Sequence, residues 1–167
     1  IRLSLVGSEM CIRDRTYLYD EHYRGQAEPS VHAEAIRARG AWIPGAIDPA
    51  ARGRGQADGR QLLQAYLDLG LELTPAANAV EAGIHAVWLR LSAGRLRVFR
   101  SCANWLAEYR VYRRDEAGRV VKQHDHLMDA TRYLALTGLA LARTAPARQL
   151  RARPSRLGAG GESWLGA

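Results

Sequence analysis

The sequence predicts an α/β fold in which strands and helices alternate along a single domain. Short runs that suit strands, such as residues 16–23 and 95–99, are separated by segments whose apolar residues recur at helical spacing, such as 59–69 and 78–91. Strands interleaved with helices are typical of layered α/β proteins. A chain of 167 residues is long enough for one domain with a substantial core.

The chain is predicted to enter the domain with a strand and a helix. Residues 16–23 are rich in aromatic side chains and form the first strand. Ser30 is placed to cap a helix over residues 31–38, and Gly40 ends it.

A second strand, helix and strand are expected to follow. Residues 41–47 form a short apolar strand, which Pro44 restricts to an edge or a bulge of the sheet. Asp58 precedes a helix over residues 59–69 that ends at Gly70, and the next strand covers residues 71–74.

The last part of the domain is predicted to contain two helices and a strand, with one segment left open. Residues 78–91 form a helix and 95–99 a strand, whereas 104–113 suits either structure. Residues 115–119 form a turn, and the final helix covers about 125–143.

Two short acidic clusters are candidates for a metal site. Asp48 ends the apolar strand at residues 41–47, and Asp125 and Asp129 lie four residues apart where the last helix begins. Side chains four residues apart share one face of a helix. Hard cations such as Mg²⁺ and Mn²⁺ bind carboxylate oxygens together with substrate phosphates. The three carboxylates therefore indicate a phosphoryl-transfer site.

Composition favours an anionic partner and excludes several classes of protein. The formal net charge is +7, which favours nucleic acid. Cys11 lies in an atypical leader, residues 1–15, so Cys102 is effectively the only cysteine of the domain. Neither a disulfide framework nor a cysteine zinc site is expected. No apolar run reaches the length of a membrane span.

Other chemistries fit the sequence less well. The chain contains neither a P-loop nor a Gly-x-Ser-x-Gly elbow. His124 followed by Asp125 is compatible with a metal phosphohydrolase of the HD type, but the contexts of the other histidines do not supply the additional ligands that such a site needs.

The two ends of the chain differ from its body. Residues 1–15 lack periodicity and resemble a translated sequencing-adapter read, so we exclude them from the fold prediction; a strand over residues 3–6 is the alternative. Residues 144–167 form a basic tail whose composition predicts disorder. Its candidate contacts with DNA or a protein partner are Arg148, Arg151, Arg153, Arg156 and Trp164.

Several motifs together resemble one family. Residues 17–23 (Tyr-Leu-Tyr-Asp-Glu-His-Tyr), 31–36 (Val-His-Ala-Glu-Ala-Ile), 43–50 (Ile-Pro-Gly-Ala-Ile-Asp-Pro-Ala) and 104–110 (Asn-Trp-Leu-Ala-Glu-Tyr-Arg) are similar to the nuclease domain of the large terminase subunit of tailed bacteriophages. The strongest match is residues 125–134, Asp-His-Leu-Met-Asp-Ala-Thr-Arg-Tyr-Leu. All these motifs occur in the order that the family has.

The resemblance implies an RNase H-like nuclease fold over residues 16–143, with a mixed central sheet flanked by helices. It implies a two-metal endonuclease that uses Mg²⁺ or Mn²⁺ to cut concatemeric viral DNA during packaging. Asp48, Asp125 and Asp129 would be the catalytic metal ligands, and Asp129 is alternatively a residue that orients a neighbouring group. The implied partners are double-stranded DNA, the portal protein and the small terminase subunit, in the host cytoplasm.

Other residues are given supporting roles by the same resemblance. Glu21, His124 and His126 would position DNA or support the metal ligands. The family also has a catalytic aspartate on an opening strand that this chain lacks, so we expect the fragment to be inactive. The alternative function is a non-catalytic module that binds DNA or docks on the portal.

Overall fold

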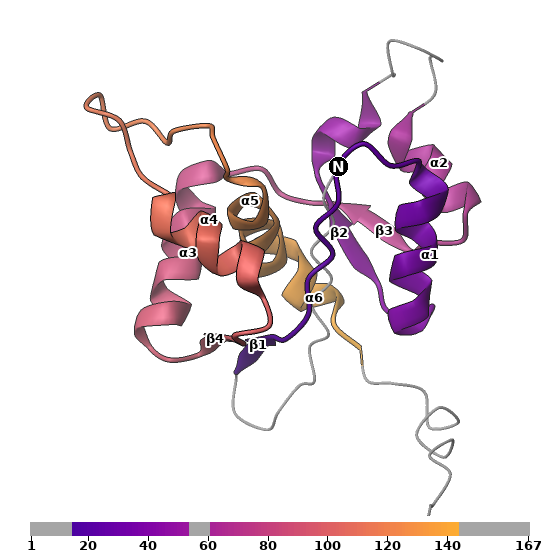
Figure 1. Cartoon of the computed structure of the whole chain (residues 1–167), viewed down its shortest axis with the longest axis horizontal. Helices are drawn as coiled ribbons and strands as arrows, with labels where there is room; N and C mark the ends of the chain where they lie inside the picture. Colours follow the sequence, from indigo (N-terminus) through magenta and orange to yellow (C-terminus); the bar gives the residue numbers. More distant parts are fainter. Residues whose placement is uncertain (1–14, 54–60, 144–167) are drawn as a thin grey trace, which may run out of the picture.

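The structure is a computed structural model that describes residues 15–53 and 61–143, and its elements alternate as an α/β fold requires (Figure 1). Residues 1–14 of the predicted leader, Asp58 and the basic tail therefore lie outside the described residues. In chain order the elements are β1 (Thr16–Leu18), α1 (Pro29–Gly40), β2 (Gly45–Ile47), the 3-10 helix η1 (Pro49–Arg52), α2 (Leu62–Asp68), β3 (Leu73–Pro75), α3 (Val80–Ser92), β4 (Leu96–Val98), α4 (Ala103–Val111), α5 (His126–Tyr133), the π-helix η2 (Leu134–Gly138) and α6 (Leu139–Leu141).

The strands form two parallel pairs. β1 pairs with β4, with Thr16 opposite Leu96 and Leu18 opposite Val98. β2 pairs with β3, with Gly45 opposite Leu73. Within the described residues these pairs are separate two-stranded sheets, and a bridge between Arg114 and Val120 closes the predicted turn at residues 115–119.

Each strand pair has its own hydrophobic core. The first core joins α1 and α2 to the β2–β3 pair, and the second joins β1 and β4 to α4 and α5 (Figure 1). The buried residues of the first are Ala33, Ile36, Ile47, Ala51, Tyr66, Leu71 and Leu73, and those of the second are Leu18, Leu96, Cys102, Trp105, Leu127 and Met128. The fold thus consists of two layered units.

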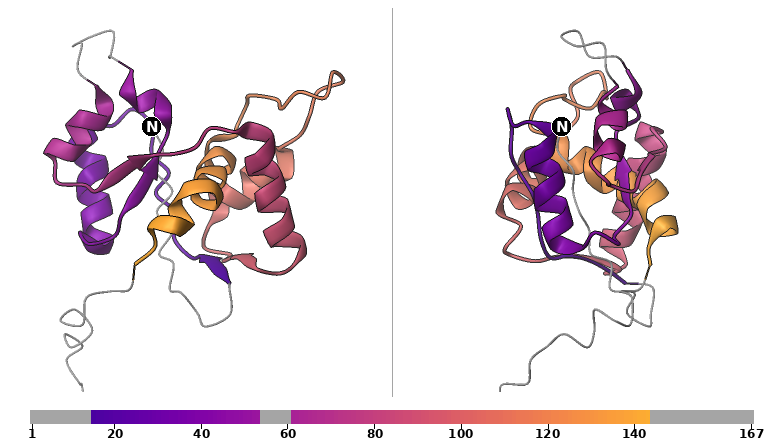
Figure 2. Two further views of the ribbon diagram at one scale, coloured as in Figure 1. Left: turned by 180° about the vertical axis from the view of Figure 1, so that it is seen from behind. Right: turned by 90° about the vertical axis from the view of Figure 1, so that its right-hand side faces the viewer.

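The helical run α5–η2–α6 connects the two units (Figure 2). α5 and η2 contact β2 of one unit, and both contact α3 of the other. The hydroxyl of Thr137 in η2 accepts a hydrogen bond of 2.9 Å from the backbone N–H of Ala77, which follows β3. The end of β2 is thereby placed beside α5, where the second acidic cluster lies.

Most element boundaries differ from the predicted ones by a few residues, and β1 and α1 illustrate the differences. β1 ends at Leu18, because Asp20 pairs with Arg39 instead of continuing the strand. α1 begins at Pro29 rather than after Ser30, since proline suits the first helical position, and no side chain caps this helix.

The open segment and the final helix also take definite forms. The segment 104–113, which suited either structure, is helical up to Val111, because α4 covers residues 103–111. The predicted helix over 125–143 is interrupted by η2, whose wider turn is typical of functional or strained positions in helices.

A histidine pair in the first unit makes stability sensitive to acid. His22 Nε2 lies 3.0 Å from His32 Nδ1, and His32 is only 4% exposed. Burial is the main cause that lowers the pKa of both rings below the ordinary 6.5, and for His22 the charge of His32 adds to it. At mildly acidic pH the two histidines of the unfolded chain therefore bind more protons than those of the folded chain.

We expect the melting temperature to fall as the pH drops below about 6.5. Stability is lost as the pH falls from the pKa of the unfolded chain, about 6.5, toward the lower pKa of the folded chain. Differential scanning calorimetry from pH 7.5 to 5 measures the slope. His32→Gln should flatten it, whereas the control His85→Gln, at an exposed position, should not. An unchanged slope in His32→Gln would contradict this assignment.

Candidate functional site

Asp48 lies where β2 ends and η1 begins. Its Oδ1 accepts a hydrogen bond of 2.8 Å from the backbone N–H of Ala50, so the carboxylate caps the short helix. Pro49 at the next position favours this abrupt change of direction. One oxygen of a half-buried carboxylate is thereby oriented at the end of a strand, where α/β folds commonly bind ligands.

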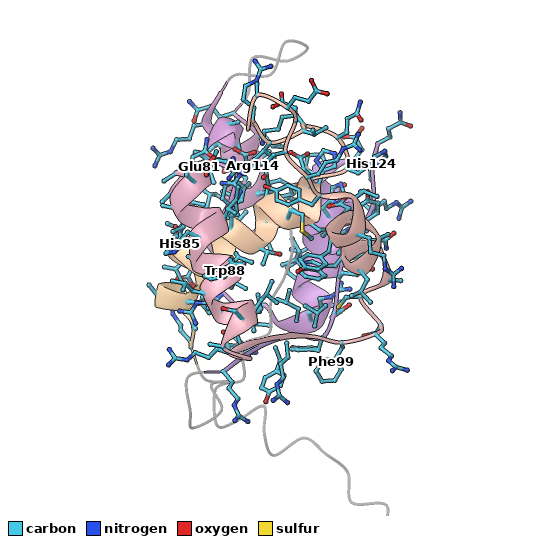
Figure 3. The ribbon with its side chains drawn as sticks, turned by 90° about the vertical axis from the view of Figure 1, so that its left-hand side faces the viewer. Glu81, His85, Trp88, Phe99, Arg114 and His124 are labelled. Carbon is cyan, nitrogen blue, oxygen red and sulfur yellow. The ribbon has the colours of Figure 1, made fainter. Side chains whose placement is uncertain are left out.

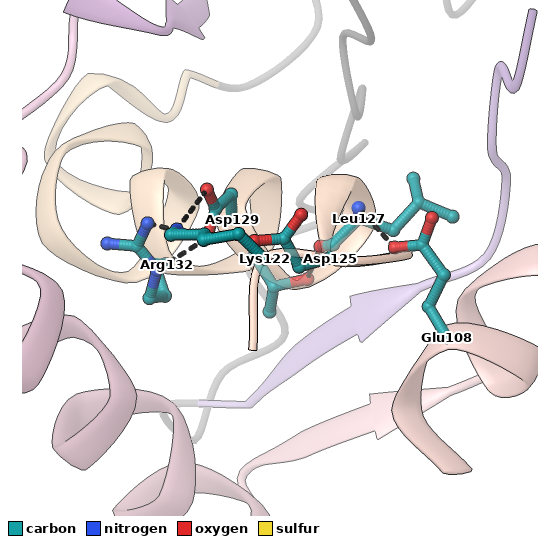
Figure 4. A network of polar contacts seen from close by, with 7 residues as sticks. Glu108, Lys122, Asp125, Leu127, Asp129 and Arg132 are labelled. Carbon is teal, nitrogen blue, oxygen red and sulfur yellow. Dashed lines mark hydrogen bonds and ion pairs between the residues drawn. The ribbon is translucent and has the colours of Figure 1, made fainter. Parts of the chain in front are cut away.

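Asp125 and Asp129 converge on one cation. The Lys122 ammonium lies 3.2 Å from Asp125 Oδ2 and 3.4 Å from Asp129 Oδ2 (Figure 4). Asp125 is 7% exposed and Asp129 is half-buried. Burial alone would lower the pKa of Lys122, but the charges of Asp129 and Asp125 raise it overall. The two carboxylates thus share a position that suits a positive charge.

Glu108 supports the helix that carries the second acidic cluster, and the sequence prediction missed it. It is 4% exposed, and its Oε2 accepts a hydrogen bond of 2.6 Å from the backbone N–H of Leu127 in the first turn of α5 (Figure 4). Asp125 occupies the N-cap position of α5, but its side chain makes no capping hydrogen bond. Glu108 therefore caps this helix and leaves the Asp125 carboxylate available to a cation.

Arg132 holds Asp129 from inside the domain. Arg132 is 2% exposed, and its Nε and Nη2 donate to Asp129 Oδ1 at 3.1 and 2.6 Å. Gly83 of α3 makes room for it, since a Cβ there would lie 3.0 Å from Arg132 Cβ. Asp129 thus uses one oxygen for Arg132 and the other for Lys122, which agrees with the alternative of an orienting residue.

Tyr133 is the last residue of α5, the helix that contacts β2. Burial raises the pKa of its hydroxyl to about 12, and the charges of Asp48 and Asp129 contribute to the shift. The negative charges of both clusters therefore act on one hydroxyl. Burial, followed by the charge of Asp129, also raises the pKa of Tyr112, whose buried hydroxyl has no hydrogen-bond partner in the described part of the chain.

The supporting residues predicted from the sequence lie in different places. His124 and His126 are exposed on either side of Asp125, and His124 has a left-handed backbone with φ of 51°. Strained backbone of this kind is frequent at functional sites. Glu21 instead caps α4, where it accepts hydrogen bonds of 2.9 and 3.0 Å from the backbone N–H groups of Asn104 and Trp105. No contact among the described residues brings Glu21 to the acidic clusters.

The donor set suits a hard cation, although it is sparse. All the candidate ligands are carboxylates, and the ammonium of Lys122 shows that two of them face one cation position. Within residues 15–53 and 61–143, no group of three or more histidine, cysteine or acidic side chains is close enough together to hold a metal.

In the same residues, no helix is long and apolar enough to cross a bilayer.

Known proteins are similar to this chain over much of its length. Residues 10–137 match the family described as the Terminase RNaseH-like domain. The large terminase subunits of Enterobacteria phage LP7 and Salmonella phage P22 are each 39% identical over 82 residues. Those alignments cover 45% of this chain but only 17% and 16% of the relatives, so the chain spans a small part of their length.

Solved structures confirm the fold. The nuclease domain of the P22 large terminase superimposes with a TM-score of 0.66 and 28% identity, over 82% of this chain and 73% of that one. The large terminase of a thermophilic bacteriophage, in complex with ADP, has a TM-score of 0.64 at 24% identity, over 77% of this chain and 35% of that one. The RNase H-like fold that the motifs implied is thus confirmed, and the chain belongs to the Terminase RNaseH-like domain family.

Proposed function

We propose that this chain is the nuclease part of a phage DNA-packaging terminase large subunit, a protein that hydrolyses phosphodiester bonds of concatemeric viral DNA. The observation that carries the proposal is that α5, which begins after Asp125 and includes Asp129, contacts β2, the strand that Asp48 follows. Carboxylates far apart in sequence are thereby carried by elements that contact each other. The location of Asp48 at a strand end, in a fold shared with the P22 nuclease domain, supports catalysis rather than capping alone.

Two Mg²⁺ or Mn²⁺ ions are the proposed cofactors, and Asp48, Asp125 and Asp129 would hold them. When bound, such ions activate the attacking water and stabilise the leaving oxygen. The resemblance gives the family a further aspartate on an opening strand, and we propose that this carboxylate completes the set and that cleavage requires it.

The remaining residues would orient groups around the reaction. Arg132 fixes Asp129 Oδ1, and Glu108 fixes the first turn of α5 on which Asp125 depends. His124 and His126 are exposed beside Asp125, where they would contact the DNA backbone. In the hydrolysis, the oxygen of water bonds to phosphorus, the bond from phosphorus to one deoxyribose oxygen breaks, and that oxygen leaves as a hydroxyl with a proton from the water.

The proposed partners are double-stranded DNA, the portal protein and the small terminase subunit, in the host cytoplasm. The alternative is a non-catalytic module that binds DNA or docks on the portal, for which the net charge of +7 is the supporting observation. Residues 144–167 would serve either function, through the arginines or through Trp164.

Metal binding separates the two functions. Isothermal titration of the chain with MnCl₂ should show binding, and MgCl₂ should compete for the same site. Plasmid DNA should be nicked by the complete large subunit with either metal and not with EDTA. If neither ion bound at millimolar concentration, the nuclease proposal would be wrong and the docking module would be favoured.

Lys122 should compete with the metal, because its ammonium occupies the position that Asp125 and Asp129 share. We expect Lys122→Gln to bind Mn²⁺ roughly 5- to 30-fold more tightly, the equivalent of about 1–2 kcal/mol. Titration calorimetry measures the change. Arg119→Gln is the matched control, since it removes the same charge from an exposed position in the turn. Equal affinities in Lys122→Gln and wild type would show that Lys122 does not occupy the metal position.

A further inference from the structure

The β1–β4 pair presents a face of alternating aromatic and basic side chains. Thr16, Leu18 and Leu96 are buried, so their neighbours along the strands point outward. Those neighbours include Tyr17 on β1 and Arg97 on β4, which are directly opposite in the parallel register. The alternation thus places a ring beside a guanidinium on the outer side of the sheet.

The rings of this face are accessible. Phe99 is 51% exposed and Tyr19 is 45% exposed, directly after the two strands. Tyr17 and Phe99 are in edge-to-face contact, with ring centroids 6.3 Å apart. Large apolar side chains that are grouped and half-exposed usually mark a binding surface, whereas isolated ones do not.

The face is also positively charged. Arg97 is exposed on it, Arg100 is exposed two residues after the end of β4, and in the described part of the chain neither forms an ion pair with a carboxylate. The acids nearest in sequence are already engaged, since Asp20 pairs with Arg39 and Glu21 caps α4. The charges of this face are therefore available to an anionic partner.

We propose that this aromatic–basic face, formed by Tyr17, Tyr19, Arg97 and Phe99 with Arg100 close by in sequence, binds single-stranded DNA. Bases stack on exposed aromatic rings while arginines contact the phosphates, and this combination binds single strands without sequence preference. Duplex DNA offers its phosphates but hides the faces of its bases, so the rings favour a single strand. Phe99 lies at the opposite end of the domain from His124, so this contact is separate from the acidic site (Figure 3).

The test is fluorescence anisotropy of the chain with labelled oligothymidine and with a duplex of equal length, in EDTA. We expect tighter binding of the single strand. Phe99→Ala should weaken it by on the order of 10-fold with an unchanged salt dependence. Arg97→Gln should reduce the slope of log affinity against log salt by about 0.7, the value for one phosphate contact on a single strand.

Matched variants control for charge and for aromatic exposure. Arg119→Gln removes the same charge from the turn, and Tyr109→Ala removes a ring that is 51% exposed on α4; neither should reproduce these effects. Asp125→Asn should leave this binding intact, so that failure of the nuclease proposal and failure of this one remain distinguishable.

Three results would overturn the proposal. One is equal affinity for duplex and single strand, and another is an unchanged affinity in both Phe99→Ala and Arg97→Gln. The third is self-association of the chain that Phe99→Ala abolishes in sedimentation experiments, which would assign the face to a protein contact. Circular dichroism of each variant verifies that it is folded.

Discussion

Replacing Asp125 with asparagine is expected to abolish Mn²⁺ binding and, in the complete large subunit, DNA cleavage. Asp125 is 7% exposed, and its carboxylate has no capping role that would compete with a metal. Loss of a group that merely supports a metal ligand already costs 10- to 100-fold in affinity or activity, so loss of the ligand itself should cost more than about 100-fold. Asparagine keeps the shape of the side chain but removes the charge that holds the cation.

Folding should change little in the same variant. The lost contact is an ion pair to Lys122, which is largely exposed, and such pairs contribute about 1 kcal/mol or less. Calorimetric titration, plasmid nicking and thermal melting measure the three quantities on one preparation. Asp68→Asn is the matched control, since Asp68 is an exposed aspartate of α2 that accepts a hydrogen bond from Gln64.

Asp48→Asn provides an independent test of Asp48 as a metal ligand. We expect it to weaken Mn²⁺ binding as well, and to lower the pKa of Tyr133, because the charge of Asp48 helps to raise it. A spectrophotometric titration of tyrosine would follow the hydroxyl. Normal Mn²⁺ binding in both aspartate variants would place the metal elsewhere, or show that none is needed.

The alternation of strands and helices could be predicted because hydrophobic periodicity is a local property. The helix over residues 78–91 and the strand over 95–99 correspond to α3 and β4, each with small changes at its ends. The pairing of the strands could not be predicted in this way. β1 pairs with β4, although the elements of the first unit lie between them in the sequence. This pairing depends on tertiary packing rather than on either sequence segment.

The candidate site shows the same division. Asp125 and Asp129 were predictable as a pair, since their spacing places them on one helical face. Arg132 is also near in sequence, but its burial depends on Gly83 of α3, which no local pattern reveals. Glu108 was hidden in a segment that suited either strand or helix, and its role became visible only when α4 was placed against α5.

Glu108 should have the largest effect on stability among these residues. Its Oε1 accepts a hydrogen bond of 3.0 Å from the Tyr23 hydroxyl and its Oε2 one of 2.6 Å from the Leu127 N–H. Hydrogen bonds to a charged group contribute about 1.5–3 kcal/mol each, and loss of a helix cap costs about 1 kcal/mol. Glu108→Ala removes the common acceptor of both donors in the interior.

We therefore expect Glu108→Ala to lower the free energy of unfolding by about 2–4 kcal/mol, measured by urea denaturation. Glu116→Ala is the control, because Glu116 is exposed in the turn and should cost little. Glu108→Gln distinguishes capping from packing. It keeps the volume of the side chain, but its amide has only one acceptor oxygen for two donors, so this variant should show part of the decrease in the free energy of unfolding. Because Glu108 fixes the first turn of α5, both variants should also bind Mn²⁺ more weakly. Wild-type stability in Glu108→Ala would show that this carboxylate does not hold the helix that carries Asp125.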